Sequence, residues 1–378
     1  MSKFLQLFHP FPLKVIDGKG IFLTLEDGKE YMDLFSGLGV NLLGYNHPAL
    51  LAALSEPFPM HLSALLEHPL KEEVAGDLTR LTGFDKVFFS NSGTEAIEGA
   101  IKFIWKWLER TGKSTERVIA FRDSFHGRTL GSMTLTDLLS HQGFPKLDIK
   151  TVFLPFGDPD ILTKEIEQSC SFVIIEPIQG AGGVRIAEPK FYKILSILHR
   201  ELGFGLIVDE IQSGLGRTGY FLSSQPLGLN PDIVTIAKGL GGGLPLGAIL
   251  LKERIANAIK PGDHGTTMGG NYLSLRLSKV VIKKIKELLE HVKNLDKLLK
   301  DIHIPELLTN PEIKNVRQEG LFIAIELRKD NADDIKEILF EKGYLVNSIR
   351  KKIIRLLPPL IISIEELEDA VNALNEVI

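Results

Sequence analysis

Two apolar runs in the middle of this sequence each end at a charged residue that could take part in catalysis. Lys238 follows Ile233–Ala237 and precedes a glycine run, which indicates close approach of a bulky group. A lysine in low-dielectric surroundings has a lowered pKa and can act as a nucleophilic amine; a lysine that reaches solvent or binds a helix end is the alternative. Asp209 closes the run Leu206–Asp209. Because an unpaired buried charge is costly, Asp209 needs a cationic partner, with a structural ion pair to Arg217 as the alternative to a functional role.

A turn of small residues is a candidate anion site. It contains Ser92, Gly93 and Thr94, and it joins a predicted strand to a predicted helix. Such a turn presents backbone N–H groups and hydroxyls to an anion at the positive end of the helix dipole. Simple capping of the helix by Ser92 or Thr94 is the other interpretation, and a phosphate site does not exclude it.

Two more segments add an aromatic ring and two arginines. Phe125, His126 and Arg128 lie on one predicted loop, although core packing for Phe125 and a structural hydrogen bond for His126 are the simpler interpretations of each residue alone. Arg355 lies inside an apolar run, and a buried arginine usually binds a carboxylate, from either the protein or a substrate. Together with the lysine, the acid and the small-residue turn, these groups form the set that pyridoxal phosphate requires.

A parallel sheet would bring these residues together. Short apolar runs predict strands at Val87–Ser90, Val118–Phe121, Phe172–Glu176, Leu206–Asp209, Ile233–Ala237 and Gly247–Leu251. Amphipathic stretches between them predict helices at Thr94–Arg110, Asp158–Gln168 and Lys190–Leu202. The alternation predicts an α/β fold with a mostly parallel sheet flanked by helices, and ligands bind such sheets at the carboxyl ends of the strands.

The sequence pattern predicts three regions. Residues 1–40 form an N-terminal segment with hairpin turns at Asp17-Gly18 and Asp27-Gly28, residues 41–272 the large domain, and residues 273–378 a smaller α+β C-terminal domain. The expected elements of the smaller domain are helices at Leu273–Leu299, Ala332–Lys342 and Ile364–Val377, and strands at Gly320–Leu327, Tyr344–Val346 and Ile353–Leu357.

Composition narrows the class of protein. The chain has 378 residues, of which 44% are hydrophobic and 24% charged, as in an ordinary globular protein. Its 48 acidic and 44 basic residues give a net charge of −4, which argues against nucleic acid or a membrane as partner. Cys170 alone can form neither an internal disulfide nor a zinc site, so we expect no metal and a cytoplasmic location. We expect no signal peptide and no membrane-spanning segment.

At these residues the chain resembles the class III pyridoxal-phosphate aminotransferases, which have the fold type I architecture. Among them it is most similar to the acetylornithine aminotransferases. The resemblance covers nearly the whole chain, through Ser36–Pro48, Phe89–Lys102, Ser124–Leu130, Glu176–Gly183, Val208–Gly219, Ala237–Gly247, His264–Asn271 and Ile354–Leu360.

The resemblance implies a role for each residue around the cofactor. Lys238 would bind the aldehyde of pyridoxal phosphate and then move the substrate's proton, and Asp209 would hold the proton on the ring nitrogen. The other implied cofactor-binding residues are Ser92, Gly93 and Thr94 at the phosphate, Phe125 and Ile211 on the two ring faces, Gln212 at the phenolic oxygen, Thr267 at the phosphate of the neighbouring subunit, and His126, which is typical of the acetylornithine enzymes.

The resemblance also implies substrates and partners. Arg355 would bind the α-carboxylate of glutamate and 2-oxoglutarate, and Arg128 that of N-acetylornithine, whose ω-amine would then reach the aldehyde. The implied activity is amino-group transfer between an amino acid and a keto acid in arginine biosynthesis. The role of Thr267 implies a homodimer with shared active sites.

Two positions depart from the family pattern. Many ω-aminotransferases have a glutamate at the position of Ala181, which neutralises the arginine matched by Arg355 while the ω-amino substrate is bound. Ala181 cannot do this, so another class III activity, on ornithine, 4-aminobutyrate or a diaminononanoate-type substrate, stays open. Tyr272 replaces the usual proline. A glutamate-1-semialdehyde-type aminomutase and a non-catalytic binding protein are the remaining alternatives, and the intact Lys238 and Asp209 argue against the second.

Overall fold

The structure is a computed structural model that describes residues 3, 5, 7, 11–57, 59, 62, 66–113, 117–139, 143–145 and 147–378. The predicted absence of a signal peptide concerns opening residues that lie largely outside this described part. Among the described residues, no helix is both long and apolar enough to cross a membrane.

A seven-stranded sheet forms the centre of the large domain, as predicted. In spatial order its strands are β4 (Lys86–Ser90), β12 (Gly247–Leu251), β11 (Ile233–Ile236), β10 (Gly205–Asp209), β7 (Phe172–Ile175), β5 (Val118–Phe121) and β6 (Thr151–Leu154). Only β12 runs antiparallel to its neighbours, β11 and β4, so the sheet is mostly parallel. The strand β6 was not predicted: it lies at the sheet edge, where three of its four residues are only partly buried, whereas the equally short β5, β7 and β11 are buried throughout.

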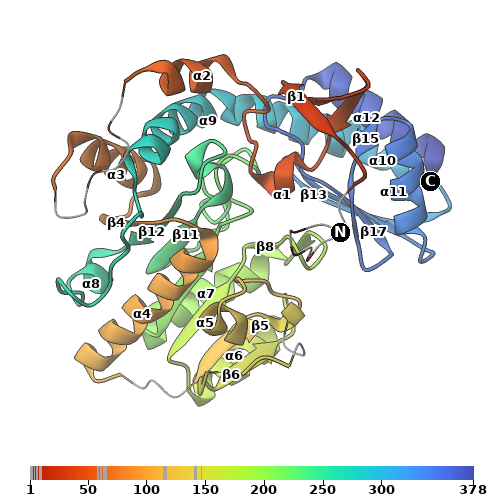
Figure 1. Cartoon of the computed structure of the whole chain (residues 1–378). Coiled ribbons are helices and arrows are strands. Elements are labelled where there is room, and N and C mark those ends of the chain that lie inside the picture. Colours follow the sequence, from red (N-terminus) through yellow and green to blue (C-terminus); the bar gives the residue numbers. More distant parts are fainter. Residues whose placement is uncertain are drawn as a thin grey trace.

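Helices cover both faces of this sheet (Figure 1). Successive residues of β10 point to opposite faces of the sheet. Ile207 packs in the apolar cluster that contains the buried side chains of α4 (Gly93–Thr111), and Val208 packs in the cluster that contains Phe191 of α7 (Pro189–Leu202). This double burial explains why the strands are continuous apolar runs. The remaining elements of this region are α2 (Pro48–Ser55), α3 (Pro69–Thr82), α5 (Leu130–Thr134), η1 (Asp137–Leu139), α6 (Pro159–Gln168), β8 (Ile178–Gln179), β9 (Arg185–Ile186), η2 (Lys238–Gly241) and α8 (Glu253–Ala256).

The C-terminal part contains a second sheet, in the order β13-β14-β17-β16. Its elements are α9 (Tyr272–Leu298), η3 (Leu299–His303), α10 (Ile304–Leu307), β13 (Ile313–Glu319), β14 (Phe322–Leu327), α11 (Ala332–Glu341), β16 (Asn347–Ile349), β17 (Ile353–Leu356) and α12 (Ile364–Val377). The sequence did not predict β13, because most of its side chains are polar and only partly buried.

The N-terminal strands form a separate sheet that includes a C-terminal strand. Its order is β1 (Val15–Lys19), β2 (Phe22–Leu25), β3 (Glu30–Asp33) and β15 (Tyr344–Leu345), and α1 (Ser36–Gly39) follows it. The pairing of β15 with β3 links the first predicted region to the third. The boundaries at residues 40 and 272 stay a prediction.

One of the two predicted hairpin turns is wrong. Asp27-Gly28 does join β2 to β3, but Asp17-Gly18 lies inside β1, and the turn to β2 is at Gly20-Ile21. A Cβ atom on Gly18 would lie 2.8 Å from Cγ of Tyr45, so this glycine allows close packing. Gly20 has φ +58°, the backbone conformation that the turn requires.

Candidate active site

A cavity of about 580 Å³ opens where β4, β7, β10 and β11 end. It is lined by every predicted site residue except Thr267, namely Ser92, Gly93, Thr94, Phe125, His126, Arg128, Asp209, Ile211, Gln212, Lys238 and Arg355. Thr267 is exposed on the loop before α9, and the adjacent Thr266 accepts a hydrogen bond of 3.0 Å from Asn91 Nδ2. That loop therefore lies beside the small-residue turn of its own chain.

The small-residue turn begins α4 and combines a cap with free donors. Ser92 is the N-cap residue, and its Oγ accepts from the backbone N–H of Glu95 at 3.2 Å. The N–H groups of Gly93 and Thr94 belong to the first helical turn, where a helix offers no internal acceptor. A Cβ on Gly93 would lie 2.9 Å from Ile211 Cδ1, so the glycine lets Ile211 pack closely against the turn. The capping and anion-binding interpretations are compatible here.

Asp209 is paired with His126 and not with Arg217. Oδ2 of Asp209 lies 2.8 Å from His126 Nδ1, and its Oδ1 accepts from the backbone N–H of Ile211 at 3.0 Å. Both side chains of the pair are buried. Arg217 is fully buried elsewhere and donates to the carbonyl oxygens of Leu321, at 3.2 Å, and Pro358. The structural ion pair considered as the alternative for Asp209 is therefore absent.

Lys238 is the second residue after β11, begins η2 and lines the same cavity. Burial lowers the pKa of its amine from 10.5 to about 8, although the nearby carboxylates of Asp209 and Glu176 act in the opposite direction. Its backbone has φ +44°, which turns the chain sharply from the strand into η2. The bulky neighbour of the glycine run is a protein side chain, since a Cβ on Gly239 would lie 2.3 Å from Leu42 Cδ1.

Glu176 is a cavity residue to which sequence reasoning gave no role. It directly follows β7, and its Oε2 accepts from the backbone N–H of Phe125 at 3.0 Å. Burial raises its pKa to about 7. Glu176 ends an apolar run just as Asp209 does, so the same signal could have found it. Its bond fixes the backbone of the loop that carries Phe125 and His126.

The loop with the aromatic ring is pressed against α4. A Cβ on Gly127 would lie 2.2 Å from Thr94 Oγ1, which only a glycine at φ +137° avoids. This approach brings Phe125 to the cavity, which Ile211 also lines. The guanidinium of Arg128 lies 5.6 Å from the ring centroid of Phe125, within cation–π range.

Arg355 has neutral partners where sequence reasoning expected a carboxylate. It donates to the carbonyl oxygen of Gly180 and to Asn347 Oδ1, both at 2.9 Å. Burial lowers its pKa to about 10, and the carboxylate of Glu176 opposes that shift. Ala181 follows Gly180 and also lines the cavity. A substrate carboxylate is therefore a chemically suitable partner for Arg355.

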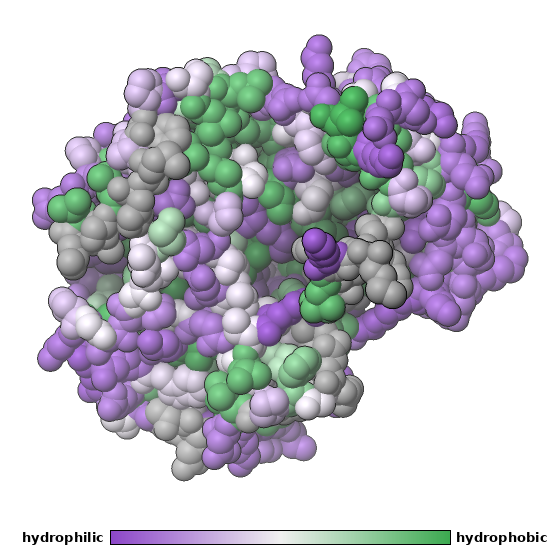
Figure 2. Space-filling view, in the orientation of Figure 1, coloured by the Kyte–Doolittle hydropathy of each residue, from purple (hydrophilic) through white to green (hydrophobic). Residues whose placement is uncertain are grey.

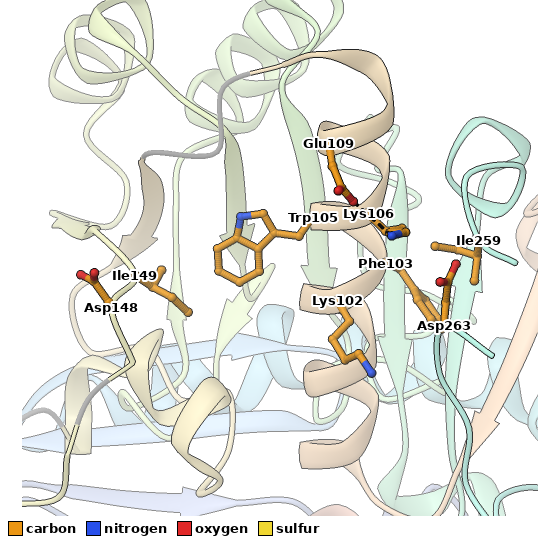
Figure 3. A pocket seen from close by; sticks show the side chains of 9 residues that line it. All are labelled: Lys102, Phe103, Trp105, Lys106, Glu109, Asp148, Ile149, Ile259 and Asp263. Atoms are coloured by element: carbon orange, nitrogen blue, oxygen red, sulfur yellow. Dashed lines mark ion pairs between the residues drawn. The ribbon is translucent and has the colours of Figure 1, made fainter.

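A second hollow, on the outer side of α4, lacks such a set of groups (Figure 3). Lys102 Nζ lies 3.0 Å from His264 Nδ1, and Lys106 is paired with Glu109 at 3.1 Å. Asp263 lies 3.8 Å from Arg110, and Asp148 lies apart from the other charged groups, so these groups do not converge on one point (Figure 3). Tyr272 lies outside both hollows, with its ring 5.2 Å from the Arg276 guanidinium. In the part of the chain that the structure describes, no cluster of side chains could hold a metal ion.

Comparison with known proteins agrees with this architecture. The sequence model of the family described as Aminotransferase class-III matches residues 7–378. The acetylornithine aminotransferase of Aquifex aeolicus (strain VF5) is 40% identical over 382 residues, covering 100% of this chain and 100% of that protein. The ornithine aminotransferase of Toxoplasma gondii, described with partial occupancy of PLP (pyridoxal phosphate) at its active site, has a TM-score of 0.92 at 28% identity, covering 99% of this chain and 92% of that one. The acetylornithine aminotransferase of Elizabethkingia anophelis has a TM-score of 0.89 at 30% identity, covering 99% and 96%. The chain belongs to the class III aminotransferases.

Proposed function

We propose that this aminotransferase uses pyridoxal phosphate to exchange an amino group between glutamate and N-acetylornithine. In one half-reaction glutamate gives up its α-amino group and leaves as 2-oxoglutarate. In the other, that amino group is added to an aldehyde carbon, which becomes the ω-CH₂NH₂ group of N-acetylornithine; the reverse direction runs the two steps backwards. The observation that carries the proposal is that one cavity holds Lys238, Asp209 and two arginines, Arg128 and Arg355. The curated relatives named acetylornithine aminotransferase support the choice of amine.

The residues of the cavity fit pyridoxal phosphate. The N–H groups of Gly93 and Thr94 at the start of α4 suit its phosphate, and Asp209 suits a protonated ring nitrogen. His126 Nε2 is buried and has no hydrogen-bond partner among the described residues, as expected where a ligand completes the site. When bound, the cofactor supplies an electron sink for the carbon that loses its proton.

The chain's own residues then move the proton and orient the groups. Lys238 Nζ would take the proton from the substrate carbon that carries the amino group, and a pKa of about 8 suits such a base near neutral pH. His126 holds Asp209 in place through its Nδ1, and the Ile211 N–H fixes the other oxygen. Phe125 and Ile211 would cover the two ring faces and keep water away.

Two arginines on different elements allow two substrate orientations. Arg355, on β17, would bind the α-carboxylate of glutamate and place its α-amine at the reactive centre. Arg128, on the loop before α5, would bind the α-carboxylate of N-acetylornithine and place the ω-amine there. The same centre would thus serve an α-amino and an ω-amino substrate in turn.

We further propose a cytoplasmic homodimer with Thr267 at the partner's phosphate site. Thr267 and its neighbour Met268 are exposed on a loop beside the small-residue turn, and Met268 is 47% exposed. Leu51 and Leu54 on α2 are also exposed, and Figure 2 shows apolar residues gathered over α2 and α9. Cross-linking and light scattering would test the dimer.

A single-turnover absorbance titration tests the function. The cofactor-loaded protein is mixed separately with glutamate, N-acetylornithine, ornithine and 4-aminobutyrate, without a keto acid. We expect glutamate and N-acetylornithine to convert the cofactor to its amine form rapidly. Multiple turnovers that need no external keto acid would indicate an aminomutase instead. Absence of any conversion of the cofactor to its amine form would indicate a binding protein.

A second candidate is a related activity on ornithine or 4-aminobutyrate. The observation that favours it is Ala181, which lines the cavity and directly follows Gly180, whose carbonyl oxygen binds Arg355. Since Ala181 cannot neutralise Arg355, the chain lacks that means of excluding α-amino acids from the ω-amine half-reaction. Conversion by glutamate and ornithine, with no response to N-acetylornithine, would select this candidate.

A further inference from the structure

One row of side chains crosses the C-terminal sheet. It consists of Arg317 in β13, Ala324 in β14, Arg355 in β17 and Asn347 in β16, each directly opposite the next in register. Directly opposed residues of antiparallel strands point to the same face and lie within contact distance. Two arginines and one amide therefore share this face, and the alanine between the arginines adds no polar group.

Both arginines bind the backbone of the same loop of the large domain. Arg317 Nε donates to the carbonyl oxygen of Gly183 at 3.0 Å, and Arg355 Nη1 donates to that of Gly180 at 2.9 Å. The loop between these two glycines contains Ala181, which lines the cavity. The anchoring of the two arginines is thus alike, and what distinguishes them is their remaining partner.

The remaining partner is charged for one arginine and neutral for the other. Arg317 is ion-paired with Glu326, which also binds Lys314 at 2.6 Å. Arg355 Nη2 instead donates to Asn347 Oδ1 at 2.9 Å. No carboxylate of the described residues is ion-paired with Arg355. The structure pairs the first arginine with a carboxylate and gives the second only neutral hydrogen-bond partners, with Glu176 acting on it from across the cavity lining.

An amide in this place has a different effect from a carboxylate. An amide oxygen fixes the orientation of the guanidinium and adds no charge, whereas a carboxylate would form a charge-assisted pair and compete for the same cation. Arg355 is 6% exposed, and its Nε has no hydrogen-bond partner among the residues that the structure describes. A buried cation with an unused donor is suited to a ligand carboxylate.

We infer that Asn347 is a positioning residue that holds Arg355, without pairing it to a carboxylate, for the carboxylate of glutamate or 2-oxoglutarate. The inference rests on the proposed function. Asn347 does not line the cavity, so it acts through Arg355. Because Ala181 offers no carboxylate either, Arg355 keeps its charge through both half-reactions.

The substitution Asn347→Asp tests the inference with almost no change in size. It places a carboxylate where the amide lies and neutralises Arg355 from within. We expect the dissociation constant of glutarate, an unreactive dicarboxylate, to rise at least about tenfold in calorimetric titrations of the cofactor-loaded protein. The glutamate half-reaction should need correspondingly more substrate. The N-acetylornithine half-reaction should keep its rate, since that substrate's carboxylate would lie on Arg128.

Two further variants separate charge from structure. Asn347→Leu removes the acceptor without adding charge, and we expect it to weaken glutarate binding less than Asn347→Asp does. Asn372→Asp adds the same charge on the exposed face of α12, and it should change neither constant. Thermal unfolding checks that each variant is folded.

Two results would overturn the inference: equal effects of Asp and Leu at position 347, or equal loss of both half-reactions in Asn347→Asp. Failure of the proposed function looks different. In that case the wild-type protein would not react with N-acetylornithine, while the glutarate titrations would still decide the role of Asn347.

Discussion

Two buried His–Asp pairs lie at opposite ends of the central sheet. His126 and Asp209 are 2.8 Å apart where β10 ends, and His199 and Asp232 are 3.0 Å apart where β11 begins. Each pair lines a cavity, of about 580 Å³ at the carboxyl end and about 610 Å³ at the amino end. Neither the pairing nor the size of the cavity therefore distinguishes a functional site from a structural one.

The difference lies in how the carboxylates are neutralised. Asp232 receives two donors of Arg254, one of them at 2.6 Å, and the backbone N–H of Leu206 at 3.0 Å. Burial alone would raise the pKa of Asp232, but the hydrogen bonds and charges of His199 and Arg254 lower it. No arginine of the described residues is paired with Asp209, and Lys238 in the same cavity has a lowered pKa. The amino end satisfies its charges internally, whereas the carboxyl end leaves charged groups available to ligands.

The largest expected effect concerns the lysine of each cavity. Lys238→Ala should reduce transamination by several orders of magnitude, because it removes both the amine that binds the cofactor and the base. Lys252 lines the amino-end cavity and donates to the carbonyl oxygen of Gly83 at 2.6 Å. Lys252→Ala should leave the turnover number nearly unchanged. Steady-state assays of glutamate formation from 2-oxoglutarate compare the turnover numbers of the two variants. A large loss of turnover in Lys252→Ala would contradict the assignment of catalysis to the Lys238 cavity.

The next effect compares the two aspartates. Asp209→Asn should lower the turnover number at least about a hundredfold with little change in stability. Asp232→Asn should keep its turnover number but lose roughly 2–3 kcal/mol of unfolding free energy. This loss is smaller than for a fully buried ion pair, because solvent around the half-exposed Arg254 screens the charges. Chemical denaturation measures the stability loss in Asp232→Asn. If Asp232→Asn were as inactive as Asp209→Asn, the proposed difference between the two His–Asp pairs would be wrong.

The stability cost at Asp232 should depend on pH in a defined direction. Because the pKa of Asp232 is lowered in the folded protein, its stabilisation is present above the ordinary carboxyl pKa and is lost as the pH falls through the lowered value. Wild-type and Asp232→Asn unfolding free energies should therefore differ at neutral pH and converge in acid. A difference that grows toward acid would contradict the pairing with Arg254.

The smallest effect concerns the aromatic ring of each end. Arg128 lies 5.6 Å from the ring centroid of Phe125, and Arg254 lies 4.7 Å from that of Trp107. Phe125→Leu should release the cofactor a few-fold more readily, since a stacking contact contributes about 1 kcal/mol. Trp107→Leu should lower stability without affecting cofactor retention. Absorbance after dialysis reports retention, and unchanged retention in Phe125→Leu would remove the stacking role.

The sequence could predict which strands end at the site, because strands covered on both faces are continuous apolar runs. Asp209 and Lys238 were found in this way, and Glu176 carries the same signal. The partner of Asp209 could not be found, since His126 lies 83 residues away and only the order of strands brings the two together. Arg217 was an equally reasonable partner on charge alone.

The C-terminal region shows the other limit of the sequence. Strand β15 is apolar enough to predict, but its pairing with β3 depends on the packing of the whole chain. Likewise, the pairing of Asn347 with Arg355 follows from the register of β16 and β17, which an amino-acid pattern of so few residues does not define.

The most direct test of the account is to locate the cofactor chemically. The cofactor-loaded protein is reduced with borohydride, which converts the carbon–nitrogen double bond between cofactor and lysine into a stable single bond, and the digested protein is analysed by mass spectrometry. We predict one modified peptide, with the cofactor on Lys238 at the carboxyl end of the sheet. Modification at another lysine, such as Lys252 at the amino end, or no modification of an active protein, would contradict the account.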